Sequence, residues 1–311
     1  DQLDVLKAAQ IAHDEGIAIP ILLGRKDTIL SLMAEIEFDT EVTIIDPKSD
    51  EEEKRRNKYA KAYWEYRKRK GVTLYAAQNI MRERNYFAAM MVNVGDADAL
   101  ISGYSRSYPT VVKPMLELIG MAKGATRIAA TNLMMTQRGP MFLSDTAINI
   151  DPSAEDLAKI VQMTARTVRM FGMEPVIAMI SFANFGSSHS PRSSKVGEAV
   201  KLLHESHPDL LVDGELQTDF ALNSEMLQRT FPFSKLAGKK VNTLIFPNLD
   251  AANITYKLLK ELNKSESIGP IMMGMRKPVH ILQLGASVDE IVNMTAIAVI
   301  DAQQKEKREL E

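Results

Sequence analysis

The amino-acid sequence predicts an α/β fold with largely parallel sheets. Apolar runs of strand length alternate with helical patterns along the whole chain, and such alternation is typical of parallel strands joined by crossover helices. The runs end at turn-forming residues, for example at Gly24 and at Asp46-Pro47. A chain of 311 residues is also long enough to divide into two lobes.

The elements follow in order from apolar spacing. Ile19–Leu23 is a compact run closed by Gly24, as expected of a buried strand, and Val42–Ile45 predicts the next strand. The helix between them carries apolar residues at helical spacing, namely Ile29, Leu32, Met33 and Ile36. Further predicted strands are Ala99–Ser102, Arg127–Ala130, Val176–Ile180, Leu210–Val212 and Leu244–Phe246. The predicted helices are Ala154–Met170, Ser194–Glu205, Ser224–Thr230 and Asp250–Leu262.

The segment from Ser49 to Lys70 is dominated by charged residues. Ser49 and Glu52 predict a capping box at its start, and acidic residues precede basic ones, which suits the helix dipole. Its aromatic residues recur at helical spacing: Tyr59, Tyr63 and Tyr66, with Trp64 beside them. Both a nucleic-acid-binding helix and a solvated helix docked through one aromatic stripe fit this pattern. We favour docking, because the chain as a whole is not basic.

Composition excludes several classes of function. Lys and Arg number 38 against 40 Asp and Glu, so the chain has no basic excess to attract nucleic acid. No apolar run reaches membrane-spanning length. Cysteine is absent, which excludes disulfides and thiolate metal sites and fits a cytoplasmic protein. The five histidines show no metal-ligand spacing, so we predict no metal site in this chain.

A hydroxyl-rich loop follows the predicted strand Val176–Ile180 and precedes a helix. It contains Asn184, Ser187, Ser188, Arg192 and Lys195 around Gly186. Loops at the carboxyl ends of parallel strands gather ligands, and a helix N-terminus favours anionic groups. These side chains are therefore candidate contacts for a phosphate or pyrophosphate group, although a plain connecting loop is the commoner outcome for such a pattern.

We interpret three aspartates, Asp145, Asp213 and Asp219, as carboxylates at strand ends, and Asp213 directly follows the predicted strand Leu210–Val212. Carboxylates in such places act as general bases or bind metals. They also accept hydrogen bonds from backbone N–H groups at helix starts and turns. From the residues alone, capping is the favoured interpretation.

The segment from Gly269 to Asn293 contains Lys277-Pro278 and Gly285-Ala286-Ser287. It closely resembles the C-terminal segment of phosphate acetyltransferases, which transfer an acetyl group between coenzyme A and phosphate. Further phrases that resemble this family occur in order along nearly the whole chain: Ala8–Ile11, Ile19–Arg25, Ala97–Gly103, Ser144–Pro152, Asp213–Asp219 and Phe246–Lys257.

The phrase Asn184-Phe185-Gly186-Ser187-Ser188 departs from the Ser-Thr-Lys-Gly-Ser that is usual in those enzymes. It is similar instead to the phosphate-acetyltransferase-like C-terminal domain of bacterial hybrid NADP-dependent malic enzymes. A chain that begins at Asp1 rather than at Met fits a domain of a longer polypeptide.

The resemblance also implies which residues would carry acetyl transfer, and these are replaced. A Ser-Arg pair in the family's C-terminal phrase aligns with Gln283 and Leu284, a helix Arg aligns with Glu261, and an Asp aligns with Glu290. A phosphate dianion needs fixed cations and the developing oxyanion needs donors. We therefore expect no catalytic residues for this reaction in the chain.

From the resemblance we expect a fold like that of isocitrate and isopropylmalate dehydrogenases, with two lobes, 1–124 plus 276–311 and 125–275, and a cleft between them. The implied function is an acetyl-CoA-binding regulatory domain of an NADP-dependent malic enzyme. Asp145, Asp213 and Asp219 are then expected to line the cleft, and Asp145 and Asp213 are expected to contact the ligand together with the hydroxyl-rich loop. No cofactor is expected here, and NADP and a divalent metal would belong to the malic-enzyme part. The alternatives are an active phosphate acyltransferase and a purely structural oligomerisation domain, and we expect a homo-oligomer.

Overall fold

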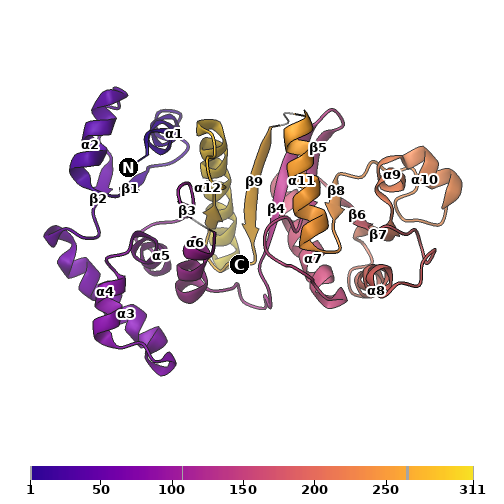
Figure 1. Ribbon diagram of the computed structural model, residues 1–311, viewed down its shortest axis with the longest axis horizontal. Coiled ribbons are helices and arrows are strands. Elements are labelled where there is room, and N and C mark those ends of the chain that lie inside the picture. The colour runs from indigo at the N-terminus through magenta and orange to yellow at the C-terminus, as the bar shows by residue number, and fades with distance from the viewer. Residues whose placement is uncertain (1, 107, 264–265, 311) are drawn as a thin grey trace. The chain divides into compact units, whose positions relative to one another are not determined.

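The computed structural model describes residues 2–106, 108–263 and 266–310. The chain folds into two compact units (Figure 1), unit 1 with residues Asp1–Gly124 and Met275–Glu311 and unit 2 with residues Ala125–Gly274. The predicted boundary placed Met275 in the second lobe. Met275 instead forms a bridge with Met121 and belongs to unit 1.

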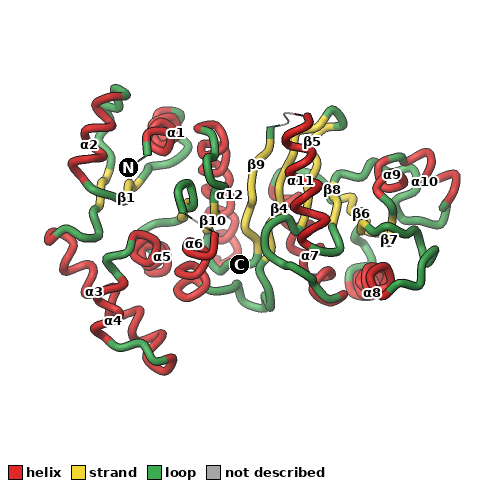
Figure 2. The backbone as a smooth tube through the Cα atoms, in the orientation of Figure 1, coloured by secondary structure: helices red, strands yellow, loops and turns green. Residues whose placement is uncertain are grey.

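The described part of unit 1 contains two small parallel sheets. Strand β1 (Ile21–Leu23) pairs with β2 (Thr43–Ile45), and β3 (Leu100–Ser102) pairs with β10 (Val279–Ile281). Helices flank these strands (Figure 2): α1 (Leu3–Asp14), α2 (Lys26–Glu35), α3 (Glu53–Arg67), α4 (Leu74–Ile80), α5 (Arg84–Val94), α6 (Tyr108–Pro114) and α12 (Val288–Leu310). Short 3-10 turns lie at Asp50–Glu52 and Lys68–Lys70, and a π-helical turn at Met115–Ile119.

The described part of unit 2 forms one six-stranded sheet in the order β7-β6-β8-β5-β4-β9. The strands are β4 (Ala129–Thr136), β5 (Gly139–Ser144), β6 (Val176–Ile180), β7 (Leu211–Leu216), β8 (Thr243–Ile245) and β9 (Ser267–Met273). Strand β4 is antiparallel to β5 and β9, and the other pairs are parallel. The helices are α7 (Ala154–Met170), α8 (Pro191–Ser206), α9 (Thr218–Leu222), α10 (Ser224–Thr230) and α11 (Leu249–Asn263). The predicted α/β fold with largely parallel sheets is confirmed.

Strand β6 shows why the apolar runs are continuous in unit 2. Ile177 and Met179 pack in the core under α7 and α8, whereas the alternate residues Ala178 and Ile180 pack in a second core that includes Tyr256 of α11. Because successive side chains of a strand point to opposite faces, a strand covered on both faces needs apolar residues throughout. Helices accordingly cover both faces of this sheet (Figure 1).

Helix α3 confirms the docking interpretation of the charged segment and corrects one detail. Tyr59 and Tyr63 are buried, whereas Tyr66 is 62% exposed, so two of the three tyrosines hold the helix. The capping box predicted for Ser49 and Glu52 is wrong. Among the described residues, the Ser49 side chain makes no cap hydrogen bond, and its hydroxyl donates to the carbonyl of Asp46 at 2.9 Å.

None of the helices in the described parts of the chain has both the length and the apolar character needed to cross a bilayer.

Candidate functional site

The hydroxyl-rich loop, defined as residues 181–195, follows strand β6 and is held against the end of the neighbouring parallel strand β7 by Glu215 and Gln217. The carboxylate of Glu215 accepts a hydrogen bond from the backbone N–H of Gly186 at 2.7 Å. The side-chain amide of Asn184 donates to the Gln217 side chain at 2.8 Å, and its oxygen accepts from the Gln217 backbone at 2.8 Å. Sequence reasoning missed Glu215 and Gln217 as site residues. The available signal for Glu215 was a second carboxylate, beside Asp213, in a short strand whose other side chains are apolar.

The tip of this loop has an uncommon backbone conformation. Phe185 has φ 41° and Gly186 has φ 80°, both in the left-handed region. For a bulky side chain such a conformation costs on the order of 1–2 kcal/mol. The ring of Phe185 packs against Phe231 and Phe233, with centroids 5.1 and 4.9 Å apart, so aromatic packing offsets the backbone cost and fixes the loop.

The serines shape the turn that leads into α8. Ser187 Oγ accepts from the backbone of Asn184 at 3.0 Å, and Ser188 Oγ accepts from the backbone of Ser190 at 3.3 Å. Ser190 in turn is the N-cap of α8 and accepts from the backbone of Arg192. The Arg192 side chain is exposed at the first turn of this helix, where the helix dipole favours an anion.

Lys195 lies where three loops meet. Its ammonium group contacts the carboxylate of Asp151 at 2.7 Å and the carbonyl of Pro247 at 3.1 Å. Asp151 follows β5, Pro247 follows β8 and Lys195 is in the helix after β6, so the lysine joins the carboxyl ends of three parallel strands. The hydrogen bond from Lys195 holds the pKa of Asp151 below its ordinary value.

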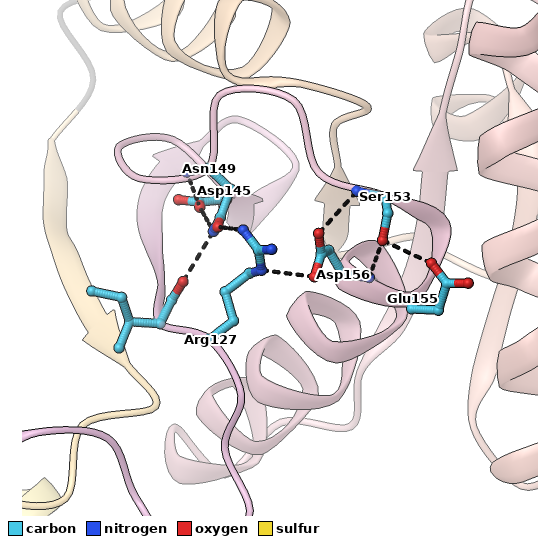
Figure 3. A network of polar contacts seen from close by, with 7 residues as sticks. Arg127, Asp145, Asn149, Ser153, Glu155 and Asp156 are labelled. Atoms are coloured by element: carbon cyan, nitrogen blue, oxygen red, sulfur yellow. Dashed lines mark hydrogen bonds and ion pairs between the residues drawn. The ribbon is translucent and has the colours of Figure 1, made fainter.

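Asp145 is buried at the end of β5 in a network of polar contacts. Its carboxylate accepts hydrogen bonds from the backbone of Ala130 at 3.1 Å and of Asn149 at 2.9 Å. Arg127 donates to the Asn149 side chain at 2.9 Å and pairs with Asp156 at 2.7 Å (Figure 3). Burial raises the pKa of Asp145, and the hydrogen bonds from its backbone partners oppose the rise.

Asp213 is also engaged by the protein itself. It lies within β7 and is buried, and its carboxylate accepts from the Ser234 hydroxyl and from the Lys235 backbone, both at 2.8 Å. The structure therefore brings Asn184, Ser187 and Ser188 together at one turn, with Arg192 and Lys195 on the following helix. It places the Asp145 and Asp213 carboxylates in hydrogen-bonded interiors.

The positions that align with the family's reactive residues lie in two places. In unit 1, Leu284 follows β10 and is 68% exposed, and Gln283 precedes it. Glu290 accepts from the Ser287 backbone at 2.9 Å while Ser287 Oγ accepts from the Glu290 backbone at 3.2 Å, a reciprocal cap at the start of α12. In unit 2, Glu261 is an exposed residue of α11.

These positions can be compared with known proteins. The family described as Phosphate acetyl/butaryl transferase matches residues 1–299. The chain belongs to this family. This match and the relatives described next confirm the predicted resemblance to phosphate acetyltransferases and to the C-terminal region of malic enzymes.

Relatives of both kinds are equally similar to the chain. An NADP-dependent malic enzyme of Haemophilus influenzae is 38% identical over 309 residues, which are 96% of this chain and 40% of that protein. A phosphate acetyltransferase of Thermoanaerobacterium thermosaccharolyticum is 38% identical over 305 residues, 96% of this chain and 92% of that protein. The chain thus spans about 40% of the length of the malic enzymes that it matches.

A solved structure gives the same family. The crystal structure of a phosphotransacetylase from Streptococcus pyogenes superimposes with a TM-score of 0.88 and 36% identity, covering 99% of this chain and 92% of that one. In the described part of the chain, no three His, Cys, Asp or Glu side chains gather as a metal-binding group.

Proposed function

We propose that this chain is a regulatory domain of an NADP-dependent malic enzyme, that it binds acetyl-CoA, and that it does not transfer acetyl groups itself. The observation that carries the proposal is the pair Gln283-Leu284, where the family resemblance implies Ser and Arg. Malate decarboxylation, with NADP and a divalent metal, would then belong to malic-enzyme domains of the same polypeptide, in the cytoplasm.

The chemistry of acetyl transfer supports the inactive assignment. An exposed leucine offers no charge to a phosphate dianion, and Glu290 is used to cap α12. Glu261 places an acid where the resemblance implies a cation. Since the loss of a single oxyanion donor costs about a hundredfold or more in rate, replacing the hydroxyl and both cations abolishes the reaction.

The proposed acetyl-CoA contacts are Arg192 and Lys195 at the first turn of α8, with Asn184, Ser187 and Ser188 beside them. Backbone donors and two cations at a helix N-terminus suit the phosphates of a nucleotide. A bound phosphate would replace Asp151 as the partner of Lys195, which now holds that ion pair at 2.7 Å. Asp145 and Asp213 contribute by holding the neighbouring strand ends in place.

Two measurements test this proposal. The purified chain should form acetyl-CoA from acetyl phosphate no faster than a buffer control, while calorimetric titration should detect acetyl-CoA binding. Arg192→Ala and Lys195→Ala should each weaken that binding about tenfold, as expected for a charge-assisted phosphate contact. Lys201→Ala, an exposed lysine of the same helix, is the matched control. Binding that both variants leave unchanged would place the ligand elsewhere.

The second candidate function is an active phosphate acyltransferase. It is favoured by the 38% identity to the phosphate acetyltransferase of Thermoanaerobacterium thermosaccharolyticum over 92% of that enzyme. Turnover that scales with purified protein and survives repurification would establish this candidate and remove the regulatory one.

A third candidate is a structural domain that only oligomerises the parent enzyme. Helix α11 supports self-association, because Ile254, Leu258 and Leu262 form an apolar stripe with exposed fractions of 63, 54 and 72%. Association of the purified chain in sedimentation velocity, without any binding of acetyl-CoA, would favour this structural role.

A further inference from the structure

Unit 1 contains a pocket of about 220 Å³ beside the carboxyl ends of β1 and β2. Its lining comes from four segments: Gly24 and Arg25, Asp46 to Lys48, Arg82 to Arg84, and Arg106. The two strand ends are joined by the backbone of Gly24, which donates to the carbonyl of Ile45 at 3.0 Å. All of these residues belong to unit 1, so this unit alone forms the pocket.

Charge in the pocket is strongly one-sided. Five basic and two acidic side chains line it, a formal excess of three positive charges in a chain of net charge −2. The acids are engaged by backbone donors. Glu83 accepts from the N–H groups of Asn85 and Tyr86 at 2.9 and 3.1 Å, and Asp46 accepts from that of Lys48 at 2.9 Å. Arg82 also donates to the carbonyl of Lys48 at 3.3 Å. Because the basic side chains outnumber the acidic ones, a bound molecule would meet a net positive field.

The backbone adds to this field. Helix α2 begins at the pocket, and Arg25 occupies its N-cap position. The guanidinium group of Arg25 has no acceptor atom that could cap the helix. The first N–H groups of the helix are therefore not capped by that side chain and favour an anion nearby. Guanidinium groups match the geometry of phosphate oxygens, and ligands of parallel sheets bind beside the carboxyl ends of the strands.

We propose that this pocket binds a phosphate or pyrophosphate group. Its volume is below the roughly 300–1,000 Å³ of pockets that enclose a drug-sized ligand, so the pocket takes the charged end of a molecule and leaves the rest outside. The group comes either from a free inorganic anion or from a nucleotide such as coenzyme A. The site is separate from the proposed acetyl-CoA contacts on α8, which lie in unit 2 and do not line it.

Calorimetric titration of the whole chain with inorganic phosphate, pyrophosphate and coenzyme A tests the proposal. Lys48→Ala and Arg106→Ala remove exposed lining residues, and each should weaken pyrophosphate binding about tenfold. Arg69→Ala, an exposed arginine of unit 1 outside the pocket, should change it less than twofold. Raising the salt concentration should weaken binding to the parent protein, because the site is open to solvent.

The three titrants identify the source of the group. Binding of the inorganic anions without coenzyme A indicates a free anion. Binding of coenzyme A that falls in the same pocket variants, and not in Lys195→Ala, indicates a nucleotide phosphate held by unit 1. The proposal is overturned if neither Lys48→Ala nor Arg106→Ala weakens the binding of any of the three titrants. This overturning result does not bear on the α8 site, which its own variants test separately.

Discussion

In unit 2, several charged and amide side chains at the strand ends form hydrogen bonds and ion pairs with other residues of the protein. In unit 1, by contrast, the ends of β1 and β2 carry an excess of basic charge around a pocket. Lys195 is paired with Asp151, and Asp145 accepts from the backbone that surrounds it. The difference teaches that a polar residue at a strand end is as readily a structural group as a ligand contact. The strand-end loops of unit 2 contain buried N–H groups, and buried donors require acceptors.

The largest expected effect is the loss of the carboxylate at Asp145. Asp145→Ala should lower the unfolding free energy of unit 2 by about 3–5 kcal/mol, because several buried backbone donors lose their acceptor. Asp151→Ala removes a carboxylate whose side chain is 79% exposed and should cost less than about 1 kcal/mol. Urea denaturation followed by far-UV circular dichroism measures both.

The single tryptophan separates the two units in that experiment. Trp64 lies in α3 of unit 1, so its fluorescence follows unit 1 while circular dichroism follows both. Asp145→Asn keeps an acceptor oxygen and should fall between the parent protein and the alanine variant. Equal costs for the alanine variants at 145 and 151 would contradict a structural role for Asp145.

The second expected effect is that the unfolding free energy depends on pH, with opposite signs for the His280 contribution in unit 1 and the Asp145 contribution in unit 2. Burial lowers the pKa of His280 to about 4, although Asp301 at 3.8 Å opposes the change. The unfolded chain takes up this proton near pH 6.5 and the folded chain near pH 4, so unit 1 should lose about 3 kcal/mol as the pH falls between these values. Burial raises the pKa of Asp145. The proton that Asp145 binds more tightly in the folded state therefore stabilises unit 2 below the ordinary pKa of an aspartate, and this stabilisation is lost as the pH rises.

Trp64 fluorescence during urea denaturation at pH 7, 6 and 5 follows the histidine contribution. His280→Gln should flatten the decrease in stability toward low pH, whatever its effect at pH 7. His13→Gln, at a side chain that is 33% exposed, should leave the decrease in place. If the slope with pH is the same in His280→Gln and in the parent protein, His280 is not the group responsible.

The smallest effect compares two capping boxes among the described residues, one from each unit. Ser153 and Asp156 cap α7 reciprocally, and Ser287 and Glu290 do the same for α12. Ser153→Ala and Ser287→Ala should each cost about 1 kcal/mol, measured by thermal denaturation. Ser49→Ala, at the position where the box was wrongly predicted, should cost about half as much because only one side-chain hydrogen bond is lost. A larger loss at Ser49 than at either cap would reverse this ranking.

Much of the fold follows from apolar spacing alone. Val176–Ile180 and Ala154–Met170 have the predicted bounds in the structure, because a strand covered on both faces and a long amphipathic helix give strong patterns. Strands β5 and β9 were not predicted. Gly139-Pro140 begins β5, and Gly269-Pro270 lies inside β9. Both pairs are typical of turns, and the second is tolerated because β9 is an edge strand whose pairing with β4 shifts register there.

The sites were harder to predict than the fold. Capping, the interpretation that the residues alone favoured for the aspartates, describes Asp145 well, since it accepts from the backbone of Ala147 and Asn149. The basic pocket has no local pattern, because its side chains come from four separated segments and only the folding of unit 1 brings them together. A contiguous motif can be found in a sequence, whereas a site assembled by topology requires the structure.

The discontinuity of unit 1 sets the order in which the protein can be completed during synthesis. Strand β3 acquires its partner β10 only after all of unit 2 has been made, and α12, which follows unit 2 in the chain, packs against α1, which precedes it. Unit 2 is continuous in the chain and has its whole sheet as soon as β9 has left the ribosome. The N-terminal half of unit 1 must therefore wait with its strand edge and its α1 face uncovered, which makes this part of the nascent chain vulnerable to aggregation until β10 and α12 emerge.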